Sequence, residues 1–543
     1  MAMGKERLAM ARMERLSQSL PELLTRNCQP LATNFRLCGE GEDFSRRLDG
    51  PFEPLRERDP WGSNGRCAWF HLSAVVPEDW AGKEVVARIQ LGGEAQVHAA
   101  DGSILQGLSA GSTQGRGFVR DLTPLFPSAQ GGEAVELWIH ARATGMQGLE
   151  RESDPDPLSS TRHGTYRASV KHLKLCLLDR ELWNLHLDYL FLLSLSRALP
   201  AAGVRRARIL KALCEVADLF RPDGSNTRAC RDILRPELEK RAGDSELTSF
   251  AVGHAHSGNS GVWSFAEGEE RCLRIFSTQL TLLEASSEHV FGASQALRYE
   301  MVKHRQPELF ARIREAIAGG RIEPLGAMWA EADCNLCSGE SLVRQILHGK
   351  NFFQDEFDLE LDHLWLSETH GFTPTLPQIA RKCGLNALVT RRVHGDPGRF
   401  AHHSFRWCGL DGTELPTHLP PSEACDSALL PETLSRSRDA FLEKDFLDLF
   451  LSTYGGEEGG CGPDEEALEL ARRAADCEGC PKVLPRPARD FLAQFLQRRA
   501  ELPAYSGDLY LDHSQGTFTS QAAVKFQNRR LEHRLRACEL LYS

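Results

Sequence analysis

Residues 247–390 alternate between short apolar segments with strand character and longer segments in which apolar residues recur at helical spacing. The expected strands are residues 247–252, 290–294, 321–329, 362–366 and 386–390, and the expected helices between them are residues 267–284, 295–318, 341–357 and 374–383. Alternation of this kind is typical of a parallel sheet or barrel. We therefore predict a chain of the α/β class, built around a parallel-sheet, βα-barrel-like domain.

Polar residues that suit chemistry follow three of these expected strands. His254 and His256 follow the first strand, Asp333 follows the third and Glu368 follows the fourth. Open α/β sheets and barrels bind ligands just past the carboxyl ends of their strands, where these side chains would meet. By itself the His-x-His spacing suits metal ligands, a capping pair or residues that support other ligands. Its convergence with two carboxylates favours a functional site over packing alone.

The rest of the chain divides into segments with different patterns. Residues 69–108 and 134–141 alternate apolar and polar positions, which indicates antiparallel strands. Residues 181–220 carry leucines at helical spacing. We expect a β-rich N-terminal lobe over residues 1–170, a helical connector over 171–245, the α/β domain over 246–515 and the first helix of a helical bundle over 516–543.

Short motifs, taken in order along the chain, resemble those of one known family. They include Gly253-His254-Ala255-His256, Ser294-Gln295-Ala296, Met328-Trp329 with Glu331, Asp333-Cys334-Asn335-Leu336, Trp365-Leu366, Phe400-Ala401-His402-His403 and Gly507-Asp508-Leu509-Tyr510. In order and spacing they resemble glycoside hydrolase family 38, the zinc-dependent retaining α-mannosidases, from about residue 60 to the end of the chain. The resemblance is closest to the cytosolic type of this family.

The resemblance implies a retaining hydrolysis of α-mannosides by two carboxylates, one acting as nucleophile and the other as acid/base. The nucleophile position is Glu368, which would also bind zinc, and the best match to the acid/base is Glu458. The implied zinc ligands are His256 and Glu368, and His254, His370 or Asn259 are the candidate substitute ligands, of which we expect His254. Substrate binding is implied for Trp263, Asp333 and Asp396. The expected substrates are α-mannosides of free oligosaccharides or glycans.

Several positions depart from the family pattern where the chemistry would occur. Gly258 stands where the family has an aspartate zinc ligand, Glu368 where it has an aspartate nucleophile, and Gly261 where it has a stacking tryptophan. The last zinc histidine of the family would lie beyond Ser543. Because misplacements on the order of 1 Å cost ~100-fold in rate, we expect weak zinc binding and impaired activity. The alternatives are a non-catalytic relative that binds carbohydrate or a protein partner, or a truncated gene product.

Composition and charge argue against several other classes of partner. The net charge is −11 and no block of Lys and Arg occurs, which argues against nucleic acid or an anionic membrane. No stretch approaches the ~18 consecutive apolar residues of a membrane span, and the N-terminus lacks the apolar core of a signal peptide. We expect a cytoplasmic protein whose 16 cysteines are reduced. The C-x-x-C pairs Cys334/Cys337 and Cys477/Cys480 leave open a four-cysteine zinc site or a redox pair.

An apolar stripe runs along the final segment of the chain. Val524, Leu531, Leu535, Cys538 and Leu541 fall on one face of an expected helix. Because exposed apolar faces favour association, we expect this helix to pack against a partner and the chain to self-associate through it.

Overall fold

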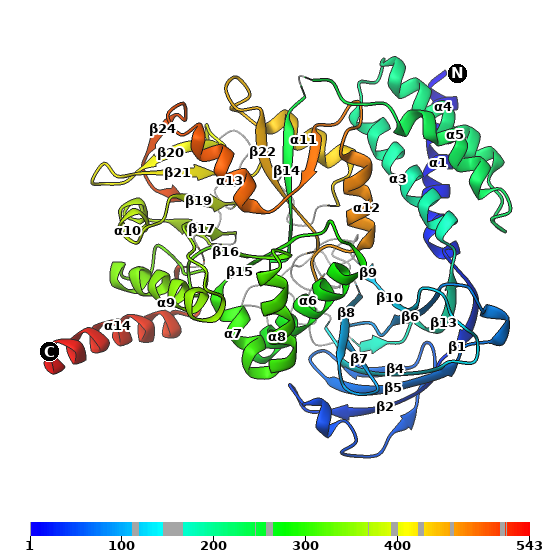
Figure 1. The fold of residues 1–543 in the computed structure, drawn as a ribbon, viewed down its shortest axis with the longest axis horizontal. Helices are drawn as coiled ribbons and strands as arrows, with labels where there is room; N and C mark the ends of the chain where they lie inside the picture. The colour runs from blue at the N-terminus through cyan, green and yellow to red at the C-terminus, as the bar shows by residue number, and fades with distance from the viewer. Residues whose placement is uncertain are drawn as a thin grey trace.

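The computed structural model describes residues 2–110, 119–144, 167–244, 246–256, 264–367, 369–391, 400–421, 428–456, 461–510, 516 and 518–543. Figure 1 shows a β-rich lobe, a group of helices beside it, and an α/β unit that carries a long C-terminal helix at its edge. Within these described ranges, no helix combines the length and apolarity that crossing a membrane requires.

The N-terminal lobe consists of two antiparallel sheets and a short strand pair. One sheet has the order β3-β2-β5-β11-β7-β8-β9, the other has the order β1-β13-β6-β10, and β4 pairs with β12. The strands are β1 (Thr25–Pro30), β2 (Ala32–Cys38), β3 (Glu53–Pro54), β4 (Pro60–Ser63), β5 (Cys67–Val75), β6 (Val85–Gln90), β7 (Glu94–Ala99), β8 (Ile104–Ala110), β9 (Val119–Arg120), β10 (Leu122–Phe126), β11 (Ala134–Arg142), β12 (Arg167–Ser169) and β13 (His172–Leu178). The predicted β-rich region is confirmed.

Period-two alternation decides which side chains of the larger sheet enter the core of the lobe. On β5 the core contains Ala68, Phe70 and Leu72, so Cys67 and Trp69 lie on the opposite face. The neighbouring strands alternate in the same way, so that this face collects buried polar residues, among them Glu94, Gln96, His98, His140 and Arg142. Helix α6 (Phe265–Ala285) of the α/β unit packs against this side of the lobe.

The helical region comprises α1 (Ala2–Leu23), α3 (Arg180–Ala198), α4 (Val204–Leu219) and α5 (Thr227–Leu238). Helix α3 contacts the other three and is buried along most of its length, because leucines and aromatic residues occupy most of its positions. The side chain of Asp179 accepts a hydrogen bond from the Leu182 amide and caps the start of α3. This confirms the helical pattern that the leucine spacing predicted.

A disulfide bond joins Cys28 of β1 to Cys176 of β13. The expectation that every cysteine is reduced is therefore wrong for this pair. The two residues are separated by 148 positions in the sequence, and only the antiparallel pairing of β1 with β13 brings them together. Thirteen other cysteines in the described part of the chain are free.

The α/β unit contains two mostly parallel sheets, with the orders β16-β15-β14-β22 (β23 also pairs with β14) and β17-β19-β21-β20-β24. Its strands are β14 (Thr248–His254), β15 (Phe291–Ser294), β16 (Ile322–Leu325), β17 (His363–Leu366), β18 (Gly371–Phe372), β19 (Ala387–Thr390), β20 (Ser404–Cys408), β21 (Glu414–His418), β22 (Leu449–Tyr454), β23 (Lys482–Pro485), β24 (Ala504–Ser506) and β25 (Leu509–Tyr510). Its remaining helices are α7 (Ala296–Arg305), α8 (Pro307–Ala318), α9 (Gly339–Phe357), α10 (Leu376–Lys382), α11 (Pro431–Ala440), α12 (Glu465–Ala474), α13 (Ala488–Gln497) and α14 (Ala522–Tyr542).

Two hydrogen bonds join these sheets into a barrel-like ring. The Ala327 amide donates to the His363 carbonyl and so links the end of β16 to β17. On the other side, the Leu451 amide donates to Nε2 of His418, which links β22 to β21. The helices surround the strands in Figure 1, and the predicted α/β, parallel-sheet class is confirmed.

Two expected elements of the α/β unit differ in extent from the prediction. The expected helix over residues 295–318 is divided into α7 and α8 at Gln306, because the residue before a proline is disfavoured in helical conformation. The expected strand over residues 321–329 ends at Leu325, because Gly326 has a positive φ of 73° and turns the chain toward Trp365.

The C-terminal helix α14 lies against the amino end of α9 and extends away from the α/β unit (Figure 1). The Glu532 carboxylate accepts hydrogen bonds from the Ser338 amide, at 2.9 Å, and from the Ser341 hydroxyl, at 2.6 Å. Arg344 forms an ion pair with Glu539. Polar contacts therefore dock α14, while its apolar residues Val524, Phe526, Leu531, Leu535 and Leu541 remain exposed.

Gly349 of α9 packs closely against the backbone that follows β16. A Cβ atom on Gly349 would lie 2.1 Å from the Ala327 carbonyl oxygen and 2.7 Å from the Trp329 amide. We expect Gly349→Ala to lower the free energy of unfolding by about 1–3 kcal/mol or more, because rigid backbone faces the added methyl group. Thermal or chemical unfolding followed by circular dichroism measures this.

The matched control for that substitution is Gly339→Ala at the first position of the same helix. There the nearest atom to an added Cβ, Cδ1 of Ile379, is 3.8 Å away, so this variant should keep the stability of the parent. Equal stability of both variants would contradict the packing argument.

Candidate functional site

Two histidines mark the carboxyl end of β14. The strand pairs in parallel with β15 on one side and with β22 and β23 on the other, so His254 and His256 enter a region surrounded by strand ends. Both side chains are buried. Gly253 permits this close approach, because a Cβ there would lie 2.9 Å from Cε1 of His289. The predicted location of the histidines at a strand end is confirmed.

His256 faces a carboxylate that arrives from another strand end. Its Nδ1 lies 3.5 Å from Oε1 of Glu331, which follows β16. Gln295, at the end of β15, accepts a hydrogen bond from the Glu331 amide at 3.3 Å. Three consecutive strand ends therefore meet at this pair. Glu331 belongs to one of the family-like motifs but had no predicted role in the site, and its position after an expected strand was the available signal.

His254 faces a fourth strand end. Its ring lies 5.6 Å, centre to centre, from the indole of Trp365 on β17. The chain then continues through the buried Ser367 to Thr369, which is also buried. Glu368, which stands between them, lies outside the described residues. The contact with Trp365 nevertheless places β17, the strand that precedes Glu368, against His254.

A glycine-rich turn continues from β22, beside His254. Gly455 has a φ of 122°, and a Cβ there would lie 2.7 Å from the His254 carbonyl oxygen. Gly456 and Gly462 then exchange backbone hydrogen bonds of 3.2 and 2.9 Å. The chain between these glycines includes Glu458, which lies outside the described residues. Both ends of the segment that carries the predicted acid/base are thus anchored next to β14.

Asp333, predicted to bind substrate, organises its own loop. Its Oδ1 accepts hydrogen bonds from the amides of Asn335, at 3.1 Å, and Leu336, at 3.2 Å. This turn leads into α9, whose first turn is capped by the hydroxyl of Ser338. These two hydrogen bonds give Asp333 a structural role in the loop before α9.

Four other positions of the predicted site cannot be placed relative to these groups. Trp263, Glu368, Asp396 and Glu458 lie outside the described residues, as does Gly258. The structure therefore pairs His256 with Glu331 and places His254 against Trp365, and the catalytic pair stays a prediction.

The described strand-end donors do not by themselves form a zinc site. A catalytic zinc normally has three protein ligands and an open position. His256 and Glu331 have the right chemistry, since imidazole and carboxylate both bind zinc, but they are two donors. Among the described residues, three His, Cys, Asp or Glu donor atoms within 4.8 Å of one another occur only at Cys67, His140 and Glu270, away from the strand ends.

Comparison with known proteins identifies two regions of the chain. Residues 246–508 match the N-terminal domain of glycosyl hydrolases family 38, and residues 34–171 match the jelly roll domain of α-mannosidase. Alpha-mannosidase 2C1 of Mus musculus is 29% identical over 530 residues, which are 95% of this chain and 49% of that protein. Alpha-mannosidase G of Dictyostelium discoideum is 28% identical and covers 93% of this chain and 46% of its own length. The chain spans about half the length of the curated relatives it matches.

Proposed function

Because the chain belongs to glycoside hydrolase family 38, we propose that it acts on α-mannosides of free oligosaccharides or glycans by a retaining hydrolysis. Glu368 attacks the anomeric carbon, and Glu458 first protonates the leaving oxygen and then activates the water that releases the sugar. The observation that supports this most is the convergence of β14, β15, β16 and β17 at His254, His256 and Glu331. The segment that carries Glu368 follows β17, and the segment that carries Glu458 follows β22, which pairs with β14.

The proposed activity is impaired. A glutamate nucleophile displaces the reacting carboxylate by one methylene from the position an aspartate would give it, and such a shift costs ~100-fold in rate. In the proposed site Trp263 and Asp396 contact the sugar, and Asp333 contributes mainly by fixing the loop before α9.

Zinc binding at this site is proposed to be weak. His256, Glu368 and His254 are the proposed ligands, and Gly258 offers no donor atom where the family has one. The Glu331 carboxylate is a further oxygen donor, and its Oε1 lies 3.5 Å from Nδ1 of the His256 imidazole. Because His256 and Glu331 are the only strand-end donors that the structure shows in contact, among the residues it describes, we assign no step of the hydrolysis to a metal ion.

A second candidate function is supported by the same deficit of ligands. A relative that has lost hydrolysis but kept the strand-end surface would bind carbohydrate, or a protein partner, without turnover. The two functions differ in one measurable property, which is release of the aglycone from an aryl mannoside.

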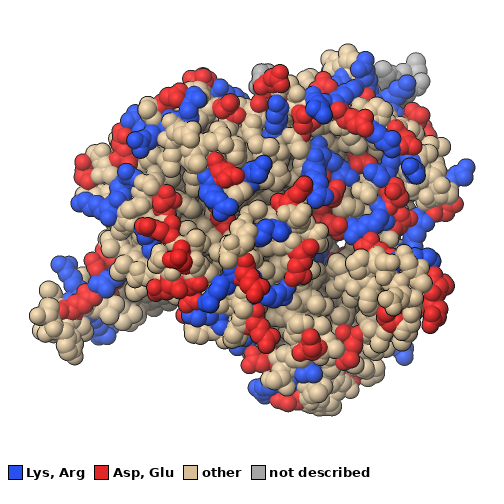
Figure 2. All heavy atoms as spheres, in the orientation of Figure 1, with Lys and Arg blue, Asp and Glu red and all other residues tan. Residues whose placement is uncertain are grey.

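Carbohydrate is the proposed partner, and we propose a cytoplasmic location. The face in Figure 2 shows basic and acidic side chains interspersed, without a continuous basic area that would attract nucleic acid or an anionic membrane. Free thiols predominate over the one disulfide among the described cysteines, which favours a reducing compartment.

Self-association through α14 is also part of the proposal. Its polar side is engaged by α9, whereas Leu531, Leu535 and Leu541 are 53%, 65% and 84% exposed. A second copy of the same helix would cover this stripe, since apolar faces of this kind favour association.

Hydrolysis is tested with an aryl α-mannoside and the purified chain. We expect turnover below ~0.1 s⁻¹, because enzymes turn over at about 10 s⁻¹ at the median and a misplaced nucleophile costs ~100-fold. Glu368→Gln and Glu458→Gln should each reduce the rate to the uncatalysed background. The adjacent Glu457→Gln is the matched control and should keep the parental rate. A folded parent with no turnover would favour the binding function instead.

Zinc binding is tested by restoring the family's ligands. Gly258→Asp together with Glu368→Asp should tighten zinc binding about tenfold or more, because two carboxylate oxygens return at the family's spacing, and tenfold corresponds to about 1.4 kcal/mol. Isothermal titration calorimetry measures the affinity. The control replaces Gly258 by Ala in the same Glu368→Asp background and adds no donor. Equal affinity in both double variants would contradict the proposed ligand set.

Sedimentation at several protein concentrations tests the role of α14. Leu531→Glu with Leu535→Glu should shift the chain toward monomer, because it places two charges on the apolar stripe. Gln527→Glu with Asn528→Glu adds the same charge at exposed polar positions of α14 and should leave the oligomer unchanged. A parent that is monomeric at every concentration would refute self-association.

A further inference from the structure

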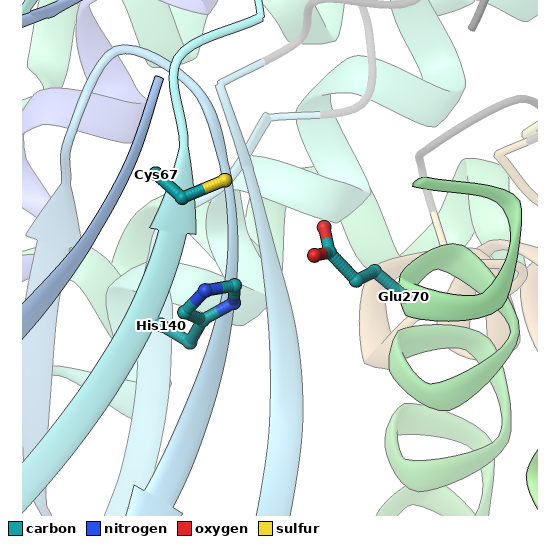
Figure 3. A group of neighbouring side chains, drawn as sticks. All are labelled: Cys67, His140 and Glu270. Carbon is teal, nitrogen blue, oxygen red and sulfur yellow. The ribbon is translucent and has the colours of Figure 1, made fainter. Parts of the chain in front are cut away.

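Three potential metal ligands meet where the β-rich lobe packs against α6. Cys67 of β5 and His140 of β11 project from the lobe, and Glu270 points toward them from α6 (Figure 3). One ligand atom from each lies within 4.8 Å of the others, and all three residues are buried. This group is separate from the strand-end site and belongs to two different regions of the molecule.

The strand register explains why the two lobe residues converge. Cys67 stands opposite Arg142 in the β5–β11 pair, and His140 is two residues from Arg142. Residues with this diagonal relation share one face of the sheet and are within reach of each other. On the other side of β5, Cys38 of β2 stands directly opposite Cys67 and therefore lies on the same face. The register thus supplies two cysteines and a histidine around one point.

An unsatisfied imidazole nitrogen points to a missing partner in this group. Nε2 of His140 is buried and has no hydrogen-bond partner within the described part of the protein. A buried polar group without a partner costs roughly 1–3 kcal/mol. A neutral imidazole nitrogen carries a lone pair that a metal ion accepts.

Hydrogen bonds fix the orientation of the Glu270 carboxylate. Its Oε2 accepts from Nε of Arg142 at 3.0 Å, and its Oε1 accepts from Nη2 of Arg142 at 3.0 Å and from the Gly41 amide at 3.2 Å. Ligand carboxylates are commonly oriented by such outer hydrogen bonds. Because each carboxylate oxygen has two acceptor positions, Oε2 retains one that can face a cation.

Charged side chains lie next to the group. Arg142 also contacts Glu40, at 3.1 Å, so two carboxylates share one guanidinium. Binding of a divalent ion to Cys67 would release the thiol proton to solvent.

We propose that Cys67, His140 and Glu270 bind a structural zinc ion that fastens the β-rich lobe to α6, with Cys38 as the fourth ligand. Cysteine, histidine and glutamate are all zinc ligands, and tetrahedral coordination at about 2.0–2.3 Å separates donor atoms by roughly 3.3–3.8 Å. The donor atoms of Cys67, His140 and Glu270 lie within 4.8 Å of one another, which is close to this spacing. The ion would cross-link residues that are far apart in the sequence and stabilise the contact between the two regions.

Cobalt substitution tests this proposal on the purified full-length chain. The chain is reduced, stripped of metal with a chelator and titrated with Co²⁺, which gives a near-ultraviolet charge-transfer band only when a thiolate is a ligand. The parent should bind one equivalent with this band, and Zn²⁺ should displace it. Zn²⁺ should also raise the melting temperature of the stripped parent, because a ligand that binds only the folded state stabilises it.

Variants locate the ion and separate this site from the proposed catalytic one. Cys67→Ser and Glu270→Gln should each lose the band, or weaken Co²⁺ binding at least about tenfold. Cys230→Ser, at a buried cysteine of α5, and His256→Ala, at the strand ends, should keep it. Circular dichroism confirms that each variant is folded.

Three outcomes would overturn the proposal. A parent without a thiolate band would refute it whatever the variants do. Loss of the band in Cys477→Ser, but not in Cys67→Ser, would assign the metal to the C-x-x-C pair. A band and a Co²⁺ affinity that are both unchanged in Cys67→Ser and in Glu270→Gln would refute the assignment of the ion to this group.

Discussion

The parallel pairing of β14 on both of its edges determines which described residues meet at the strand ends. Since β15 and β22 run in the same direction as β14, the chain leaves all three strands at one end of the barrel-like ring. His254, Gln295 and Gly455 are the residues reached at that end. Had β22 been antiparallel, Gly455 would lie at the opposite end of the ring from the histidines.

The β-rich lobe supports this arrangement from outside the ring. Arg120 of β9 donates to the carbonyls of Gly462 and Pro463. Gln279 of α6 donates to the carbonyls of Cys461 and Pro463. Residues 461–463 are therefore held by the same lobe and the same helix that carry Cys67, His140 and Glu270.

Local pattern predicted much of the fold and part of the site. The five strands of residues 247–390 were predictable because buried parallel strands are short apolar segments between amphipathic helices. The break before Pro307 was readable in principle from proline chemistry, but helical spacing continues across it. His254 and His256 were found because they follow a strand in sequence. Glu331 was given no role, since its contact with His256 depends on how β14 and β16 flank β15.

Contacts between residues that only the register of the strands brings together could not be predicted from the sequence. Cys28 and Cys176 form a disulfide across 148 positions, and Cys67, His140 and Glu270 come from two strands and a helix. No short motif contains either group, because neighbours in a sheet are set by pairing rather than by spacing along the chain.

The contacts at the strand ends differ in kind from those at the junction between the lobe and α6. At the strand ends His254 packs on Trp365, Glu331 is held by Gln295, and Gly455 fits against the His254 carbonyl. Contacts between residues of the chain itself therefore fix the geometry of the described strand ends. At the junction, the imidazole of His140 is buried and its Nε2 has no hydrogen-bond partner among the described residues. A buried nitrogen of this kind costs stability until a ligand satisfies it, so the junction is the place where a bound ion would contribute to the stability of the fold.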